Sequence, residues 1–341
     1  MPSVPGDSPP AGAAVPASGS VLEVRDLSVE YLLERGTVLA VDKVSFDLAA
    51  GEFLGIVGES GCGKSTLLFA VAQLLVPPAE VTAGSVIFKG RNMVGLTDKE
   101  MTAIRWRNLS VVMQSAMNAL NPVKSIGAQF SDAMRAHGVA SKGEIAERSA
   151  EVLKMVGIDP VHLKSYPHQL SGGMRQRSMI AMAMLFTPDL VIMDEPTSAL
   201  DVVAQRSLMV QIKELQEQLG FAIIFVTHDM SLVSHFSDRL MVMYGGLVAE
   251  LGATRRVFDS PLHPYSIGLL EAFPSIRGPR VPLTGIPGSP PNLASIPPGC
   301  RFAPRCPKVM ARCEVEPPEL YQVDGTLVRC FLHGGGGLGD D

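Results

Sequence analysis

Cysteine is scarce along most of this chain of 341 residues: it has only five, and four of them lie between residues 300 and 330. No uninterrupted apolar run approaches the roughly 18 residues of a membrane span. The opening stretch is rich in Pro, Ala, Gly and Ser and lacks the basic and apolar segments of a secretion signal. Because disulfides persist mainly in oxidising compartments, we expect a cytosolic chain whose thiols are free, catalytic or metal-bound.

A surplus of basic charge is also missing. The net charge is -5, whereas a surface that binds nucleic acid normally has an excess of Lys and Arg. We therefore expect no nucleic-acid partner. Hydrophobic residues make up 46% of the chain, which is ample for a packed core, and the length suggests about two domains. We interpret residues 1–20 as a disordered leader and the glycine-rich residues 334–341 as a flexible tail.

A glycine-rich loop follows the first strongly apolar segments. Residues 21–31 and 41–58 alternate apolar and polar residues and then become continuously apolar at FLGIV, as buried strands do. The next residues, GESGCGKST, fit the pattern GxxxxGK[ST] and precede the apolar, helix-like run TLLFAVAQLL. A chance glycine turn is the alternative, but a strand before the loop and a helix after it predict a P-loop.

A P-loop binds phosphate through backbone amides that turn inward at a helix N-terminus. Lys64 would reach the terminal phosphates, and the Ser65 hydroxyl would ligate Mg²⁺. The predicted nucleotide-binding residues of this loop are Gly58, Ser60, Gly61, Gly63, Lys64, Ser65 and Thr66.

Two acidic residues end another apolar strand, LVIMDEP, at residues 190–196. A P-loop fold places its magnesium and its attacking water at such a strand end. Asp194 would hold Mg²⁺, and Glu195 would polarise the water. An acidic pair at the beginning of a loop is by itself more often a helix cap, but the preceding strand and the upstream P-loop favour the catalytic interpretation.

A second glycine-rich helix start lies between these motifs, in LSGGMRQRSMIAMAMLF (170–186). Its Ser-Gly-Gly turn opens a helix with basic residues in the first turns, which is another anion site. One ATP cannot easily use two separate glycine-rich helix ends of one subunit. We therefore predict that this second site serves a nucleotide held by a partner chain.

The segments GESGCGKST, LSGGMRQR, VIMDEPTSALD and FVTHD occur in this order, and together they resemble the ATP-binding subunits of ABC transporters over about residues 21–255. The resemblance implies an α/β P-loop NTPase of the RecA-like type. Its cassette would carry an α-helical subdomain at about 115–170 and an antiparallel β subdomain. The resemblance further implies a head-to-tail dimer with two ATPs, each between the P-loop of one cassette and the LSGGM turn of the other.

The resemblance also assigns roles to single residues. Ser171 and Gly173, with Gly172 between them, would contact the γ-phosphate of the partner's ATP. Asp201 would cross the dimer seam, and His228 would bind the γ-phosphate of its own ATP. Tyr31 could stack on adenine, although a packed tyrosine at a strand end is an equally good interpretation.

The segment between Gln114 and residue 170 is where this family has its helical subdomain. Gln114, at the end of SVVMQ, would sense Mg²⁺ and the attacking water. A capping box, Ser141 with Glu144, and a stop at Gly157 predict a helix in 141–157. In importers this region receives a short helix of the permease, and the LNP stretch at 120–122 resembles the dipeptide and oligopeptide importer branch. A plain connecting loop is the alternative there.

The segments SPLHPYSIGLLEAFPS (260–275) and IPGSPPNLASIPPGCRFAPRCP (286–307) resemble the C-terminal extension of that branch, which we expect at 256–333. Its cysteines lack the CxxC spacing of zinc ribbons, and thiolate softness alone does not choose between zinc and iron. Members of the branch hold a 4Fe-4S cluster at similarly spaced cysteines. The resemblance thus favours a cluster over Zn²⁺ or unligated thiols, with the ligands Cys300, Cys306, Cys313 and Cys330.

The function implied by the resemblance is ATP hydrolysis that powers peptide import at the cytoplasmic face of the cell (inner) membrane. The expected partners are two transmembrane permease subunits, a second ATPase subunit in a heterodimer and, indirectly, an extracellular or periplasmic substrate-binding protein. Nickel and glutathione importers are alternatives, because this chain never meets the cargo. A non-transport ABC ATPase would generally have two cassettes or a long coiled coil, whereas this chain has one P-loop. An iron-sulfur NTPase of repair would leave the LSGGM turn unexplained.

Overall fold

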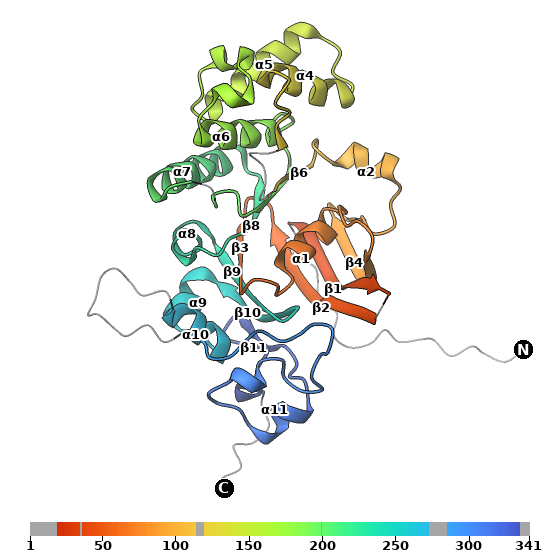
Figure 1. Ribbon diagram of the computed structural model, residues 1–341, viewed down its shortest axis with the longest axis vertical. Helices are drawn as coiled ribbons and strands as arrows, with labels where there is room; N and C mark the ends of the chain where they lie inside the picture. The colour runs from red at the N-terminus through yellow and green to blue at the C-terminus, as the bar shows by residue number, and fades with distance from the viewer. Residues whose placement is uncertain (1–18, 35, 114–118, 199, 273–284, 335–341) are drawn as a thin grey trace, which may run out of the picture.

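The computed structural model describes residues 19–34, 36–113, 119–198, 200–272 and 285–334, and Figure 1 shows how their elements are arranged. Most strands of the two sheets and most helices lie before about residue 255, and a mostly irregular segment follows. Among the described residues, no helix has both the length and the apolar character needed to cross a bilayer.

The smaller sheet is antiparallel, in the order β2-β1-β4-β5. Its strands are β1 (Ser20–Leu33), β2 (Gly36–Ala49), β4 (Ala79–Phe88) and β5 (Arg91–Asn92). The long strand β1 pairs with β2 on one side and with β4 on the other. This sheet matches the antiparallel β subdomain expected from the sequence.

The larger sheet has eight strands in the order β11-β12-β10-β9-β3-β8-β7-β6. The strands from β9 to β6 run parallel, whereas β10, β11 and β12 are joined in antiparallel pairs. Their bounds are β3 (Phe53–Val57), β6 (Leu109–Val112), β7 (Leu190–Asp194), β8 (Ala222–Val226), β9 (Arg239–Tyr244), β10 (Leu247–Ala253), β11 (Tyr321–Val323) and β12 (Thr326–Val328).

The central strands β3, β7 and β8 are buried along their whole length. Side chains alternate between the two faces of a strand, so each strand contributes to two cores. Phe53 packs in one core with residues of the helices α7 and α8, and Leu54 packs in the other with α1 and the small sheet. The continuously apolar strands in the sequence follow from this burial on both faces.

The helices lie around the large sheet, with α4, α5 and α6 grouped at the top of Figure 1. The predicted helix in 141–157 is confirmed as α5: the Ser141 hydroxyl accepts the Glu144 N–H at 3.3 Å. The bounds are α1 (Lys64–Val71), α2 (Asp98–Ile104), α4 (Ile126–Ala136), α5 (Lys142–Met155), α6 (Gly172–Ala183), α7 (Val202–Leu219), α8 (Met230–Phe236), α9 (Thr254–Asp259), α10 (Pro264–Glu271) and α11 (Ala311–Val315).

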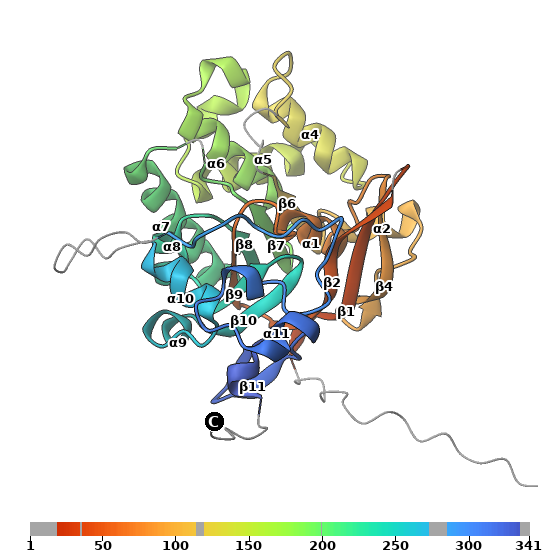
Figure 2. The same ribbon diagram turned by 60° about the horizontal axis from the view of Figure 1, so that its bottom comes forward.

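The C-terminal segment continues the cassette sheet. Strand β12 pairs with β10, and the hairpin partner β11 forms the outer edge. In Figure 2 the segment that begins at residue 285, drawn in blue, crosses the molecule toward β2 before it returns to α11. Leu293 of this segment borders the same cavity as Gly58 and Lys64 of the P-loop.

Candidate nucleotide site and the four-cysteine segment

The P-loop connects β3 to α1, as the sequence predicts. Gly58 and Gly63 have φ angles of 153° and 99°, which side chains rarely adopt. A Cβ at Gly58 would lie 2.3 Å from the Met243 carbonyl oxygen, and a Cβ at Gly63 would lie 2.2 Å from that of Ala40. Only glycine fits at these two positions, because the backbone of neighbouring strands comes so close.

The predicted P-loop residues surround one cavity of about 480 Å³, which is within the usual range for a small-molecule site. Lys64 is the first residue of α1, and its ammonium group donates to the carbonyl oxygens of Gly58 and Glu59 at 2.8 and 2.9 Å. The lining residues are Tyr31, Val38, Ala40, Gly58, Ser60, Gly61, Gly63, Lys64, Ser65, Thr66, Glu195, His228 and Leu293.

Asp194 ends β7 with its side chain 3% exposed, and its Oδ1 has no hydrogen-bond partner. Burial raises the pKa of this carboxyl, a hydrogen bond from Ser65 lowers it, and the charge of Glu195 raises it. An unpartnered buried carboxylate oxygen close to a hydroxyl is a suitable ligand set for the hard cation Mg²⁺. These two residues therefore fit the metal that the sequence predicts here.

Glu195 and His228 approach each other at the mouth of this cavity. Nδ1 of His228 lies 3.4 Å from Oε2 of Glu195, and the His228 side chain is 68% exposed. The Glu195 N–H donates to the Val226 carbonyl oxygen at 2.9 Å and so fixes the acid beside β8. The two side chains assigned to water and to the γ-phosphate are thus brought together, although 33 positions separate them (228 minus 195).

Tyr31 also lies at the cavity. Its hydroxyl is 3.1 Å from the Thr66 hydroxyl at the start of α1. This contact fits a tyrosine at the edge of a nucleotide site and equally fits a packed strand-end tyrosine, so its adenine contact stays a prediction. Gln114 lies outside the described residues, and its predicted role stays a prediction as well.

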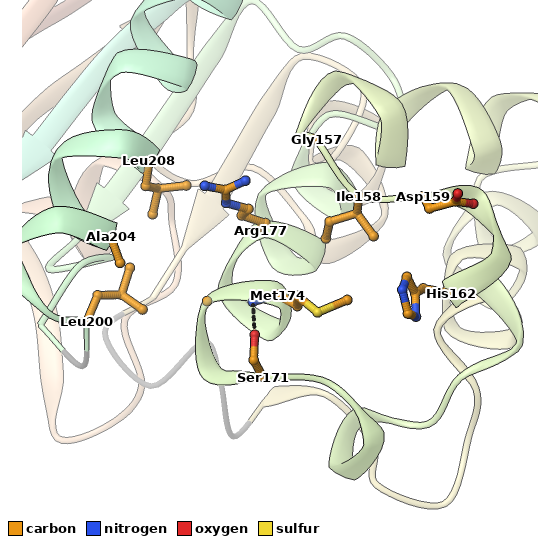
Figure 3. A pocket seen from close by; sticks show the side chains of 11 residues that line it. Gly157, Ile158, Asp159, His162, Ser171, Met174, Arg177, Leu200, Ala204 and Leu208 are labelled. Atoms are coloured by element: carbon orange, nitrogen blue, oxygen red, sulfur yellow. Dashed lines mark hydrogen bonds between the residues drawn. The ribbon is translucent and has the colours of Figure 1, made fainter.

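The LSGGM turn lies at a different cavity, of about 320 Å³. Ser171 caps α6 by accepting the Met174 N–H at 3.2 Å, which Figure 3 shows as a dashed line. Leu200 and Leu208 border the cavity from the side of α7. Asp201 caps α7 through the Ala204 N–H at 2.9 Å.

The P-loop and the LSGGM turn therefore line separate cavities. Ser171 and Gly173 line the second cavity, and neither of them, nor Gly172 between them, is among the described residues that line the P-loop cavity. The cavity at the P-loop thus does not include the LSGGM turn of the same chain. This separation is what the predicted two-chain site requires.

The four clustered cysteines all border one small cavity in the C-terminal segment. The Cys300 N–H donates to the Cys313 carbonyl oxygen at 2.7 Å, and Sγ of Cys306 accepts the Lys308 N–H at 3.4 Å. Burial raises the pKa of Cys300 and Cys306, and it raises that of Cys330 to about 11.

No group of three or more His, Cys, Asp or Glu side chains in the described ranges is arranged to hold a metal ion. The four thiols, Cys300, Cys306, Cys313 and Cys330, are thus gathered at one place without forming a ligand set. The predicted 4Fe-4S cluster and the alternative Zn²⁺ site therefore stay predictions.

Sequence reasoning missed several residues that border or hold the P-loop. Leu293 of the C-terminal segment lines the nucleotide cavity. The buried hydroxyl of Tyr265 accepts the Glu59 N–H at 2.9 Å, and Arg305 forms an ion pair with the Glu59 carboxylate. No local pattern marks these residues, because their partners lie far away in the chain.

The fold and the cavity define a P-loop nucleotide-binding protein with the layout of an ATP-binding cassette. The sequence profile of the family described as "ABC transporter" matches residues 41–198. A second profile, described as "Oligopeptide/dipeptide transporter, C-terminal region", matches residues 249–313.

Relatives match the chain over nearly its whole length. A dipeptide transport ATP-binding protein of Bacillus subtilis is 45% identical over 92% of this chain and 94% of its own length. An oligopeptide transport ATP-binding protein of Salmonella typhimurium is 44% identical over 91% and 93%. The chain therefore belongs to the family of ATP-binding subunits of dipeptide and oligopeptide ABC transporters.

Solved structures agree with the fold. The ATP-binding cassette MJ0796, in a dimeric post-hydrolysis state bound to ADP and Pi, is 30% identical with a TM-score of 0.62. The alignment covers 69% of this chain and 99% of that cassette. The remaining part of this chain lies outside that cassette.

Proposed function

We propose that this chain is the ATP-hydrolysing subunit that powers the import of dipeptides or oligopeptides across the cytoplasmic membrane through a separate permease. The observation that carries this proposal is the match to peptide transport ATP-binding proteins along nearly the whole chain. The match includes a C-terminal region, at 249–313, that is described for this transporter branch. The cassette at 21–255 and the extension at 256–333 are the proposed functional units.

The chemistry rests on residues of the P-loop cavity. The P-loop amides and Lys64 hold the phosphates, and Glu195 polarises the attacking water. His228, whose imidazole lies 3.4 Å from the Glu195 carboxylate, contacts the γ-phosphate. When bound, Mg²⁺ neutralises part of the phosphate charge, with Ser65, Asp194 and Gln114 as its proposed protein contacts. Tyr31 borders the adenine.

The proposed ATP site is shared by two chains. The separation of the P-loop cavity from the LSGGM cavity supports a head-to-tail dimer, in which Ser171, Gly172 and Gly173 reach the partner's γ-phosphate. Asp201, exposed at the start of α7, crosses the seam. The proposed partner is a second, different ATPase subunit, which makes the pair a heterodimer.

The cassettes drive transport by closing on ATP. Binding must favour the closed dimer over the open one, because a ligand with equal affinity for both states shifts no equilibrium. Closure draws together the two permease subunits docked on the helical subdomains at about 115–170, and hydrolysis resets them. The chain is then peripheral at the cytoplasmic face of the membrane, and the substrate-binding protein acts on it only through the permease.

A metal in the four-cysteine segment remains a separate proposal, with a 4Fe-4S cluster first and Zn²⁺ as the alternative. Its support is that the four thiols border one cavity and that a short irregular segment has little apolar surface of its own to bury. No step of ATP hydrolysis depends on it.

The test is affinity purification of the tagged full-length chain from membranes, followed by peptide uptake in cells. We expect two integral membrane proteins and a second ATPase to co-purify. A Lys64→Ala control should retain these partners and lose uptake, because it removes the phosphate contact and changes only the P-loop. Recovery of ribosomal proteins or DNA without membrane partners would overturn the proposal.

A further inference from the structure

An arginine of the C-terminal segment reaches into the P-loop. Arg305, in a 3-10 turn directly before Cys306, has a side chain only 5% exposed. Its Nη1 lies 2.7 Å from Oε2 of Glu59 and its Nη2 lies 2.9 Å from Oε1, so the pair is bidentate. Glu59 is the second residue of the P-loop and lies 246 positions earlier in the chain. Bidentate arginine–carboxylate pairs fix geometry as well as charge.

Arg305 is itself held rigidly. Its Nε donates to the Pro287 carbonyl oxygen at 2.8 Å, and Nη2 donates to that of Ile286 at 3.3 Å. Its Nη1 also bonds to the Tyr244 hydroxyl of β9 at 3.3 Å. A buried guanidinium with every nitrogen bonded has little freedom to move. It can therefore fix the position of whatever it binds.

Glu59 is held at three points. Its carboxylate binds Arg305, its N–H donates to the buried Tyr265 hydroxyl at 2.9 Å, and its carbonyl oxygen accepts from Lys64 at 2.9 Å. The two partners from outside the P-loop, Arg305 and Tyr265, lie beyond residue 255. The backbone of Glu59 sets the direction of the next amides, at Ser60 and Gly61, which line the nucleotide cavity.

A second arginine of the same segment supports the neighbouring backbone. Arg301, largely buried, donates to the Gly245 carbonyl oxygen and pairs with Asp42. Gly246, which follows Gly245 in the chain, donates its N–H to the Cys62 carbonyl oxygen within the P-loop at 3.0 Å. The C-terminal segment thus supports the P-loop from two sides.

We infer that Arg305 is a positioning residue for the nucleotide site: through Glu59 it fixes the P-loop so that the amides are already directed toward phosphate. A preorganised loop loses less conformational freedom on binding, and the difference appears as affinity. Leu293, which lines the same cavity, places the C-terminal segment beside the nucleotide at a second point. The inference rests on the nucleotide site proposed above and assigns that site a component outside the cassette motifs.

The test is equilibrium titration of the full-length chain with a fluorescent ATP analogue and Mg²⁺. Because a hydrogen bond to a charged group is lost, we expect Arg305→Gln to weaken binding about tenfold. Glu59→Gln should do the same, and the double variant should be no weaker than either single one, since both changes break one interaction. Arg305→Lys keeps the charge but cannot bind both oxygens, so it should recover only part of the affinity.

The matched control is Arg329→Gln. Arg329 is also an arginine of the C-terminal segment, but its side chain donates to the carbonyl oxygens of Val248 and Pro318, and within the described ranges it forms no hydrogen bond or ion pair with the P-loop. We expect it to leave the Arg305–Glu59 pair in place and ATP affinity unchanged. An equal loss of affinity in Arg329→Gln would overturn the inference, because general loosening would then suffice.

The remaining outcomes are also decisive. Wild-type affinity in both Arg305→Gln and Glu59→Gln would overturn the inference and leave the proposed function intact. Failure of the wild-type chain to bind the analogue would overturn the proposed nucleotide site, and the inference with it. Glu59→Gln changes the P-loop and not the C-terminal segment, so it still tests the pair if Arg305→Gln does not fold.

Discussion

His263 joins the cassette to the C-terminal segment, and its protonation should loosen this connection in acid. The imidazole is 4% exposed, and its Nδ1 accepts the Tyr265 N–H at 2.9 Å, which begins α10. Burial lowers the pKa of His263 to about 3. A hydrogen bond with the Arg329 backbone raises this pKa, whereas the nearby charges of His333 and Arg329 lower it. Because Nδ1 accepts, the ring must be neutral for α10 to begin here.

The magnitude follows from the difference between the folded and unfolded pKa values. Between about 3 and the ordinary value of 6.5, the unfolded chain binds more protons at His263 than the folded chain does, so stability rises with pH in this window. At 1.36 kcal/mol per pH unit, a change from pH 7 to pH 5 removes about 2 kcal/mol. The neighbouring carboxyl of Glu250 acts with the opposite sign: burial raises its pKa, so acidification favours its folded state.

The variant His263→Asn separates the two effects. Asparagine keeps a side-chain acceptor for the start of α10 but does not titrate, whereas Glu250 is unchanged. The measurement is amide hydrogen exchange of residues 260–271 in the full-length chain at pH 7 and pH 5, expressed as a protection free energy. Between pH 7 and pH 5, the protection free energy of the wild type should fall by about 2 kcal/mol more than that of the variant. The smaller asparagine side chain lowers the stability of the variant equally at both pH values, so this loss cancels in the difference.

Equal pH dependence in the two proteins, within about 0.5 kcal/mol, would refute the reasoning, because His263 would then not titrate between folded and unfolded states. A larger loss in the variant would refute it as well. Since Tyr265 contacts Glu59 from the same helix, the acid effect should extend to ATP affinity in wild type.

Three further predictions concern the chemistry. Glu195→Gln removes the group that polarises water, so phosphate release by the reconstituted complex should fall about 10² to 10⁴-fold. ATP binding should persist, and the closed dimer should live longer. Near-normal turnover would remove Glu195 from that role. Ser171→Arg should stop hydrolysis at the partner's P-loop and leave monomer ATP affinity intact, whereas Lys64→Ala should abolish that affinity; equal loss of monomer binding in both would contradict the two-chain site. Anaerobically purified protein should be brown, with equal amounts of iron and sulfide, and Cys306→Ser should bleach it and expose residues 286–333 to protease. Colourless protein with one zinc per chain would replace the cluster by a zinc site. Absence of any metal, together with an unchanged protease pattern in the variant, would contradict both the cluster and the zinc site.

The sequence alone was enough for the parts of the site that depend on local order. The strand, glycine loop and helix around Lys64 are contiguous, so spacing and periodicity identify them. The same holds for α5, whose cap and stop lie within the helix's own segment, and for Asp194 and Glu195 at the end of an apolar strand. In each case the interaction that defines the element joins residues a few positions apart.

Only the tertiary structure decided which distant segments meet. No sequence motif linked the C-terminal segment to the nucleotide site, yet this segment supplies Arg305 to the P-loop and Leu293 to the cavity wall. Its strand β12 joins the cassette sheet through β10, which brings the two regions together. Such contacts depend on strand order and on the crossing of residues 285–299 over the sheet. Local sequence preferences do not encode that order. Glu59 and its partners Tyr265 and Arg305 are more than 200 positions apart, so only the packing of the folded chain brings them together.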